Sequence, residues 1–301
     1  MNLQTTTQPP SPAEIRSRLH GMWDAVAPAW GEHAEYADAR GADVGERMLE
    51  LAALRPGDRV LELASGTGGL GFAAAARVAP DGTVVVSDVA AAMTTIAAAR
   101  AEARGLQNVT ARVLDLEAID EPDESYGTVL CREGLMFALD PVRATGEIVR
   151  VLRPGGRFVA AVWGPREENP WLGVVLDAAS AQLGRPVPPP GTPGPFSLSD
   201  SARLAEVLAA GGLADVAIEA RAVPLQAGSF DEWWTRTSAL AGPLAAVLPS
   251  LGEDGQRELR ERARVGAQAF ETSGRLEFPG VSLVATGRRP ASREVDLRLS
   301  P

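Results

Sequence analysis

Residues 60–71 read Val-Leu-Glu-Leu-Ala-Ser-Gly-Thr-Gly-Gly-Leu-Gly, and this stretch decides the fold of the chain. The apolar residues at its start predict a short buried strand, the glycines predict a turn, and the Ala-rich residues 69–79 predict a helix. Glycines are needed in such a turn where the backbone approaches a ligand closely, with φ values that other residues resist. The order of strand, glycine-rich turn and helix therefore predicts a cofactor site at the carboxyl end of the strand.

The same stretch contains a dinucleotide fingerprint, because Gly66, Gly68 and Gly71 satisfy G-x-G-x-x-G. In that fingerprint the first glycine lies at the end of the strand, so that a pyrophosphate meets the helix N-terminus. Here the strand ends at Glu62, four positions before Gly66. The Glu62 carboxylate would repel a pyrophosphate but suits the ammonium and sulfonium of S-adenosylmethionine. An alternative role for Glu62 is to cap the neighbouring helix.

Acidic residues also follow the next two expected strands. Asp88 lies twenty positions after Gly68, where its carboxylate can accept hydrogen bonds from both hydroxyls of a ribose. Asp115 and Leu116 follow the third strand, where they can give one polar and one apolar contact to an adenine. The sequence therefore predicts one nucleoside site shared by three strand ends.

Strands and helices alternate after residue 58, which is typical of a mostly parallel sheet covered on both faces. The expected strands are 59–63, 83–89, 110–114, 127–130, 157–163, 215–225 and 281–288. The expected helices are 69–79, 90–104, 141–152 and 201–210, with helical material from 229 to 272 that forms a cap. Residues 41–165 are the predicted cofactor-binding core, and 201–289 complete its sheet.

The regions outside this core differ from it in composition and in predicted structure. Residues 1–12 are an expected disordered lead-in, and 290–301 an expected tail. Ser11, Pro12 and Glu14 predict the start of a helix that ends near Pro28, within a helical lid over 13–40, and a second helix is expected around 44–52. Gly184 to Pro195 holds six prolines and three glycines, so we interpret 166–200 as an irregular lid or linker.

Composition narrows the class of partner. The 301 residues carry a formal net charge of −10, which disfavours nonspecific binding to nucleic acid or to an anionic membrane and favours a small-molecule substrate. Cys131 is the single cysteine, and His20 and His33 are the two histidines, so we expect no intramolecular disulfide and no metal site. With no apolar window of about 20 residues, the expected location is the cytoplasm.

Five motifs, in order across residues 58–163, resemble class I S-adenosylmethionine-dependent methyltransferases, and among them the ubiquinone/menaquinone C-methyltransferase-like (methyltransferase type 11) family. They are 62–68, Ser87-Asp88 with Met93, Asp115-Leu116, 126–137, and Glu147 with 150–156. The resemblance implies an α/β, Rossmann-like, seven-stranded, mostly parallel sheet whose last strand, 281–288, is antiparallel. It also implies an N-terminal helical lid over the cofactor. Ala64-Ser65 depart from the Gly-Cys or Ala-Cys usual in the family, a mild change.

The resemblance and the spacing together give a set of expected cofactor contacts. They are Trp30, Glu62, Ala64, Ser65, Gly66, Gly68, Asp88, Val89, Met93, Asp115, Leu116 and Cys131. Core packing competes with binding for Met93, Leu116 and Cys131. Trp23 and Trp30 can flank the sulfonium or simply pack. Of Trp233 and Trp234 at most one faces the pocket, because neighbours on a helix point about 100° apart.

The expected activity is methyl transfer to a C, O or N atom of a small, largely apolar acceptor, of the kind found in secondary metabolism, with S-adenosylhomocysteine as product. Candidate general bases are His33 first and Glu133 second, unless the acceptor is already nucleophilic. One alternative is a cofactor-binding protein of this fold with a regulatory or non-methylating role. A nicotinamide-dependent oxidoreductase is a further alternative, although the chain lacks a recognisable Tyr-x-x-x-Lys pair.

Overall fold

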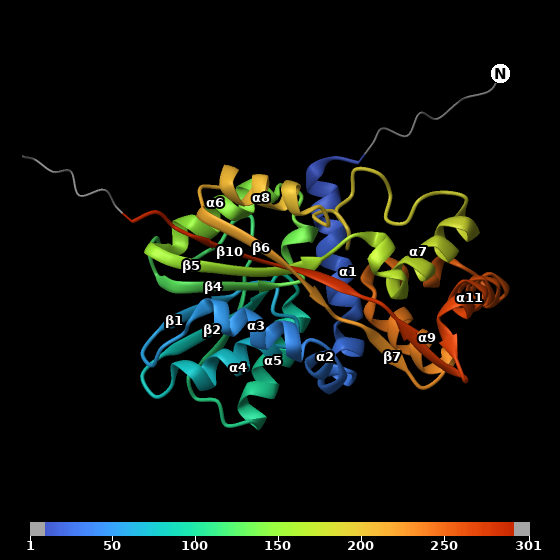
Figure 1. The fold of residues 1–301 in the computed structure, drawn as a ribbon, viewed down its shortest axis with the longest axis horizontal. Coiled ribbons are helices and arrows are strands. Elements are labelled where there is room, and N and C mark those ends of the chain that lie inside the picture. The colour runs from blue at the N-terminus through green and yellow to red at the C-terminus, as the bar shows by residue number, and fades with distance from the viewer. Residues whose placement is uncertain (1–9, 292–301) are drawn as a thin grey trace, which may run out of the picture.

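A seven-stranded sheet forms the centre of the protein, whose computed structural model describes residues 10–291. The strand order is β3-β2-β1-β4-β5-β10-β6 (Figure 1). The bounds are β1 Arg59–Glu62, β2 Thr83–Asp88, β3 Val109–Val113, β4 Tyr126–Arg132, β5 Leu152–Trp163, β6 Ala214–Ala222 and β10 Val281–Arg288. β1 to β5 pair in parallel, and β10 runs antiparallel to both β5 and β6. The predicted fold class is confirmed.

Helices cover both faces of this sheet, as buried parallel strands require (Figure 1). On one face lie α3 Ala42–Ala52, α4 Gly69–Val78 and α5 Ala91–Ala103, and on the other α6 Pro141–Val151 and α8 Ser201–Ala210. Alternate residues of one strand serve the two layers: Val60 joins the core under α3 and α4, and Leu61 joins the core under α6 and α8. The sheet is therefore held rigid, and its carboxyl edge is free to carry loops.

The N-terminal segment forms two helices, α1 Pro12–Glu32 and α2 Ala34–Arg40. The predicted helix start is confirmed, with Ser11 and Glu14 in a reciprocal capping box. The predicted end near Pro28 is wrong, because α1 continues through Pro28 to Glu32. A proline removes one helical hydrogen bond, and the packing of Val26 and Ala27 against Ala90 and Met93 offsets that loss.

A second lobe, at the right of Figure 1, combines helices with a small sheet. Its elements are α7 Pro170–Leu183, β7 Leu225–Ala227, α9 Phe230–Leu240, α10 Gly242–Ala245, α11 Glu253–Ala267, β8 Glu271–Thr272 and β9 Arg275–Phe278, with sheet order β7-β9-β8. The expected strand 215–225 is in fact two strands of different sheets. Helix α7 occupies part of the expected linker 166–200, because its apolar side chains, Trp171, Leu172 and Val175 among them, are buried. Residues 184–195 contain neither helix nor strand, as predicted.

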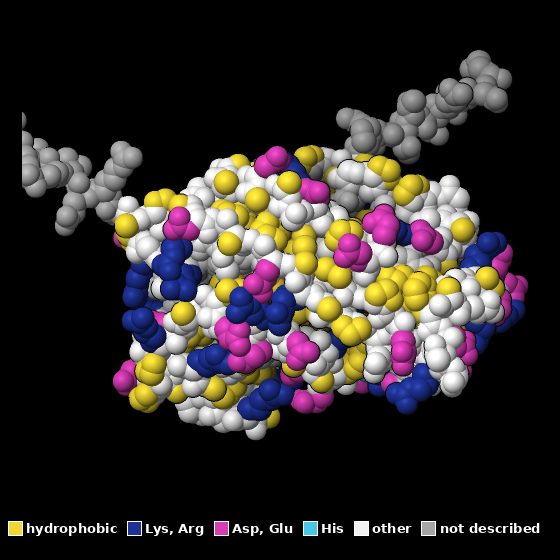
Figure 2. Space-filling model, viewed as in Figure 1, with side chains coloured by type: hydrophobic (Ala, Val, Ile, Leu, Met, Phe, Trp, Pro, Cys, Tyr) yellow, Lys and Arg dark blue, Asp and Glu magenta, His cyan; other side chains and the backbone are white. Residues whose placement is uncertain are grey.

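Short 3₁₀ turns complete the chain at Leu135–Phe137, Arg166–Glu168, Leu248–Ser250 and Gln268–Phe270. Within residues 10–291, no helix is both long and apolar enough to cross a bilayer. Acidic and basic side chains are interspersed over most of the face in Figure 2. All 29 basic residues of the chain are arginine, since the sequence contains no lysine.

Candidate active site

One cavity lies at the carboxyl edge of the sheet, where β1, β2 and β4 end. Glu62 and Asp88 are the last residues of β1 and β2, Glu133 directly follows β4, and all three line the cavity. Helices α1 and α2 cover it, and the end of α9 with the start of α10 closes the far wall. This is the edge at which α/β proteins bind their ligands.

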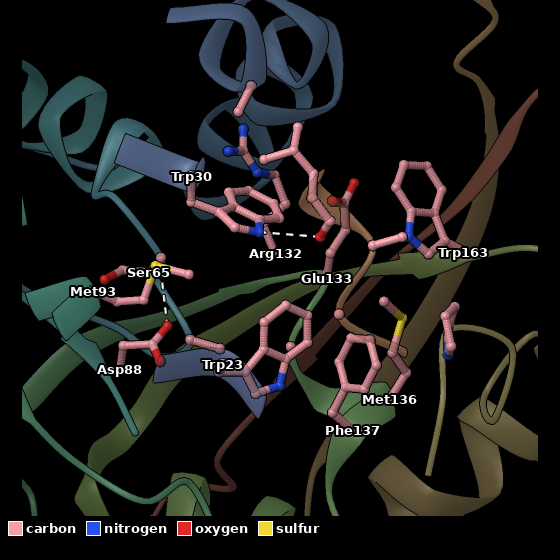
Figure 3. Close-up of a pocket in the computed structure, with 18 of the residues that line it drawn as sticks. Trp23, Trp30, Ser65, Asp88, Met93, Arg132, Glu133, Met136, Phe137 and Trp163 are labelled. Carbon is pink, nitrogen blue, oxygen red and sulfur yellow. Dashed lines mark hydrogen bonds between the residues drawn. The ribbon is translucent and has the colours of Figure 1, made fainter. Parts of the chain in front are cut away.

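Side chains of two kinds divide the cavity (Figure 3). Ser65, Asp88 and Met93 lie on one side of Trp30, and with Glu62 we call this the carboxylate end. Glu133, Trp163 and Met136 lie on the other side, and with Arg40 and Trp171 we call this the aromatic end. The two ends differ in which groups they offer to a ligand.

The glycine-rich turn forms the floor of the carboxylate end. Ala64, Gly66 and Gly68 all have positive φ, at 51°, 53° and 91°. Gly66 lines the cavity under Trp30, whose Cε3 would be 4.0 Å from an added Cβ. Gly68 does not line the cavity: its Cβ would come within 2.6 Å of the Phe72 ring, so helix packing explains this glycine. The two glycines therefore serve different purposes.

Glu62 combines both roles proposed for it. Its Oε2 accepts a hydrogen bond from the N–H of Gly71 at 2.8 Å, in the first turn of α4, while the residue also lines the cavity. Burial raises the pKa of Glu62 to about 8, against the opposing charge of Arg132. Glu62 therefore holds a proton near neutral pH unless a cation lies beside it.

Asp88 is fixed by two backbone amides. Its Oδ2 accepts from the N–H of Gly66 at 2.9 Å, and its Oδ1 accepts from the N–H of Ala90 at 3.0 Å. Each oxygen keeps a second lone pair for a ligand hydroxyl. Burial raises the pKa of Asp88, and these amides oppose that rise. Nearby, the buried Oγ of Ser65 has no hydrogen-bond partner among the described residues, so this end offers polar groups to a ligand.

Residues that follow the second and third strands also line the cavity. Val89 follows β2 and Met93 lies in α5, whereas Asp115 and Leu116 come after β3. Asp115 is also tied to the lid, because its Oδ2 lies 3.5 Å from Nε of Arg16 in α1. The apolar Met93 and Leu116 can therefore flank a flat ring, with Asp115 at its rim.

Glu133 anchors the floor of the aromatic end. Its backbone has a φ of +59°, and its N–H donates to the carbonyl of Ala161 in β5 at 2.7 Å. Burial raises the pKa of the Glu133 carboxyl, and the charges of Arg132 and Arg40 oppose the rise. A raised pKa makes the ionised carboxylate a stronger base than an exposed one.

Three residues expected at the site do not line the cavity. They are His33, Gly68 and Cys131. His33 sits at the junction of α1 and α2, where its backbone closes one helix and starts the next. Cys131 belongs to the buried core, and burial raises its pKa to about 12. Successive side chains of β4 point to opposite faces of the sheet, which turns Cys131 away from the ligand edge.

Other aromatic residues divide between the cavity and the core. Trp23 and Trp30 both line the cavity, and Nε1 of Trp30 donates to the carbonyl of Leu240 at 3.1 Å. Neither Trp233 nor Trp234 lines it. Trp233 packs on Phe278, with ring centroids 5.0 Å apart, so both tryptophans serve the second lobe.

Several residues that line the cavity were not predicted from the sequence. They are Tyr36, Arg40, Arg132, Trp163, Trp171 and Arg236. For Arg132 and Trp163 a signal existed, because each is the last residue of a strand of the sheet. The others come from helices whose placement depends on long-range packing.

Comparison with known proteins agrees with this geometry. A family model described as a methyltransferase domain matches residues 54–179. This part of the chain is therefore similar to methyltransferase domains. It holds β1 to β5 and all three strand-end carboxyl groups of the cavity.

Several relatives of this part of the chain carry quinone-related names, while others, from Mycobacterium, are named only as uncharacterized proteins. A demethylmenaquinone methyltransferase of Symbiobacterium thermophilum is 30% identical over 154 residues, which are 50% of this chain and 61% of the relative. The ubiquinone/menaquinone biosynthesis C-methyltransferase UbiE of Hydrogenovibrio crunogenus is 38% identical over 147 residues, 47% of this chain and 57% of the relative. The chain thus spans about three fifths of the length of these relatives. The predicted resemblance is confirmed.

The likeness in fold extends beyond residues 54–179. The crystal structure of the [4+2]-cyclase SpnF has a TM-score of 0.59 at 20% identity, over 91% of this chain and 96% of SpnF. At this identity the likeness concerns the fold, which is therefore shared by nearly the whole of both chains.

Proposed function

We propose that this protein transfers a methyl group from S-adenosylmethionine to a small, largely apolar acceptor. One observation carries the proposal: the cavity at the strand ends of the region that matches a methyltransferase family model presents Glu62 and Asp88 at one end and the rings of Trp163 and Trp171 at the other. The first end suits a cationic nucleoside, and the second suits an apolar molecule.

The groups at the carboxylate end fit this cofactor. Glu62 faces its ammonium and sulfonium, and Asp88 accepts from its ribose hydroxyls. Ser65 Oγ supplies a further polar contact, while Met93 and Leu116 enclose the adenine. An ionised Glu62, beside the glycine-rich turn, would repel the pyrophosphate of a nicotinamide cofactor. The absence of lysine from the sequence also removes the Tyr-x-x-x-Lys pair of many oxidoreductases.

The bound cofactor supplies a methyl carbon activated by the sulfonium, so the protein mainly has to align the acceptor. Helices α1 and α2, the lid, cover the cavity. Arg16 of α1 donates to Glu117 at 2.6 Å, Asp24 accepts from the N–H of Ala92 at 3.1 Å, and Trp30 bonds to Leu240. These contacts tie α1 to both walls of the cavity, and they must loosen for ligands to enter.

Where the acceptor must lose a proton, Glu133 is the base. Its carboxyl lines the cavity and its pKa is raised by burial, whereas His33 lies away from the cavity. The order expected from the sequence, His33 before Glu133, is therefore reversed. An acceptor that is already nucleophilic needs neither.

Thermal unfolding with added ligands tests the proposed cofactor. S-adenosylhomocysteine binds the native state only and should raise the melting temperature as its concentration rises. NAD⁺ and NADP⁺ should not. A rise with either dinucleotide and none with S-adenosylhomocysteine would contradict the proposal.

A further inference from the structure

Arg40 occupies an unusual position at the aromatic end. It is the last residue of α2, and its guanidinium carbon lies 3.9 Å from the ring centre of Trp171 in α7 and 5.0 Å from that of Trp163 at the end of β5. Its Nε and Nη2 are both shielded from solvent, and neither has a hydrogen-bond partner among the described residues. Arg40 lines the same cavity as Glu62 and Asp88.

An arrangement of this kind is costly without a ligand. Arginine stays protonated in proteins, and a buried charge without hydrogen-bond partners destabilises the fold. The two indole faces attract the positive charge but provide no oxygen for the N–H donors. Two donors left in this state are consistent with a partner that arrives from outside the chain.

Other arginines of the cavity are already engaged. Nη1 of Arg132 donates to the carbonyl of Gly41 at 3.1 Å. Arg236 lies 2.5 Å from a carboxylate oxygen of Glu232, and Arg16 lies 2.6 Å from Glu117. Among these cavity arginines, Arg40 is the one whose buried donors have no partner among the described residues.

The free donors select a particular shape of anion. Nε and Nη2 lie on one edge of the guanidinium, and their two parallel N–H groups match the two oxygens of a carboxylate. Glu133 lies close enough for its charge to act on Arg40 and would oppose a doubly charged phosphate group. Trp163, Trp171 and Leu172 surround the position with apolar surface.

We propose that the acceptor is an apolar carboxylic acid, aromatic or aliphatic, whose carboxylate is bound by the Nε–Nη2 edge of Arg40. This inference rests on the proposed function for the assignment of the carboxylate end to the cofactor. Trp163, beside Arg40, lies on the far side of Trp30 from Asp88 (Figure 3). The carboxylate is therefore the group that is recognised, and the methyl group goes to another atom of the acceptor.

Paired probes test this inference. Benzoate, 2-naphthoate and octanoate are each titrated calorimetrically against the wild-type protein, with and without S-adenosylhomocysteine, beside their uncharged primary amides. At least one acid should bind roughly tenfold or more tightly than its amide, as expected for a charge-assisted pair of hydrogen bonds. Equal binding of acid and amide throughout, or no binding of any acid, would overturn the inference without any variant.

Variants of Arg40 test whether this residue causes the tighter binding of the acid. Arg40→Met should abolish the preference for the acid, change amide binding less than about twofold, and leave the affinity for S-adenosylhomocysteine within about twofold. Arg40→Lys keeps the charge without the fork and should recover only part of the preference. Arg264→Met removes an arginine that lies over the Phe230 ring outside the cavity and should keep the preference. A preference for the acid that survives in Arg40→Met would overturn the assignment.

Stability separates binding from a purely structural role. Since Arg40 is an unpaired buried cation, Arg40→Met should melt at the wild-type temperature or above it. The inference fails if Arg40→Met is strongly destabilised and the wild-type protein binds acid and amide equally. Arg40 then has a structural role only. If S-adenosylhomocysteine does not bind, the proposed function fails. The inference about Arg40 is still tested, because acids and amides are also compared in the absence of S-adenosylhomocysteine.

Discussion

The two ends of the cavity are built in opposite ways. Residues of the carboxylate end come from strand ends and from the turn that follows β1, and backbone amides already hold both of its carboxyl groups. The aromatic end gathers side chains from α2, β5, α7 and the loop after β4, and Arg40 there has free donors. A preformed polar site beside an apolar pocket with one unmatched cation suggests that the cofactor end is generic and the acceptor end is specific.

The largest effect should come from the aromatic end. Glu133→Gln should lower kcat by about 10²-fold, with cofactor affinity retained, because the buried carboxyl is the proposed base. Steady-state kinetics with a turned-over acceptor measure this loss. His33→Ala is the matched control and should keep full activity. Full activity in Glu133→Gln would mean that the acceptor needs no base.

Asp88 tests the carboxylate end. Asp88→Ala should bind S-adenosylhomocysteine at least about tenfold more weakly, since two hydrogen bonds to a charged group, each about 1.5–3 kcal/mol, are lost from the ribose. Calorimetric titration gives the affinity, and circular dichroism checks the fold. Cys131→Ala, at the end of β4 but outside the cavity, should bind as the wild type does. Unchanged binding in Asp88→Ala would place the ribose elsewhere.

Glu62 should make the affinity of the carboxylate end for S-adenosylhomocysteine depend on pH. The bound ammonium favours the ionised carboxylate, whose pKa in the ligand-free protein is about 8. Affinity for S-adenosylhomocysteine should therefore weaken severalfold as the pH falls from 8 to about 6, because binding must then release a proton. Titrations at several pH values measure the slope, and Glu62→Gln should remove it. A flat profile in the wild type would separate Glu62 from the ammonium.

Folding stability responds to Glu62 in a related way. The folded-state pKa is raised from 4.5 to about 8, so the folded protein binds more protons than the unfolded chain between these values. The contribution of Glu62 to the free energy of unfolding therefore falls as the pH rises through this window. Denaturant unfolding should show a smaller decline in Glu62→Gln, and an identical decline in both proteins would contradict the raised pKa.

The smallest effect concerns the contact between Trp30 in α1 and Leu240 at the end of α9. Trp30→Phe removes the hydrogen bond to Leu240 and should cost about 1 kcal/mol. Hydrogen exchange of residues 229–248, which we expect to be more mobile than the sheet without ligand, should then rise further in the ligand-free protein. Trp234→Phe is the control, because Trp234 does not line the cavity. Uniform protection of residues 229–248 with and without ligand would contradict their expected mobility.

The sequence predicted the carboxylate end well because its signals are local. A strand end, a glycine turn and an acidic residue at a fixed spacing placed Glu62, Gly66 and Asp88 at the cavity. Gly68 and Cys131 were misplaced at the level of single side chains. Helix packing occupies the Cβ position of Gly68, and Cys131 lies in the buried core.

The aromatic end could not be predicted in the same way. Arg40 meets Trp163 and Trp171 only after α2 folds over the sheet and α7 packs beside it. Helix α7 itself went unrecognised because the proline-rich residues 184–195 follow it directly. Long-range packing, not local pattern, therefore creates the specific half of the site.

A crystal structure with S-adenosylhomocysteine tests the division of the cavity most directly. We predict the ribose hydroxyls on Asp88, the amino group facing Glu62, and the sulfur directed past Trp30 toward Glu133. A ligand bound at the aromatic end, or a ribose away from Asp88, would contradict the account.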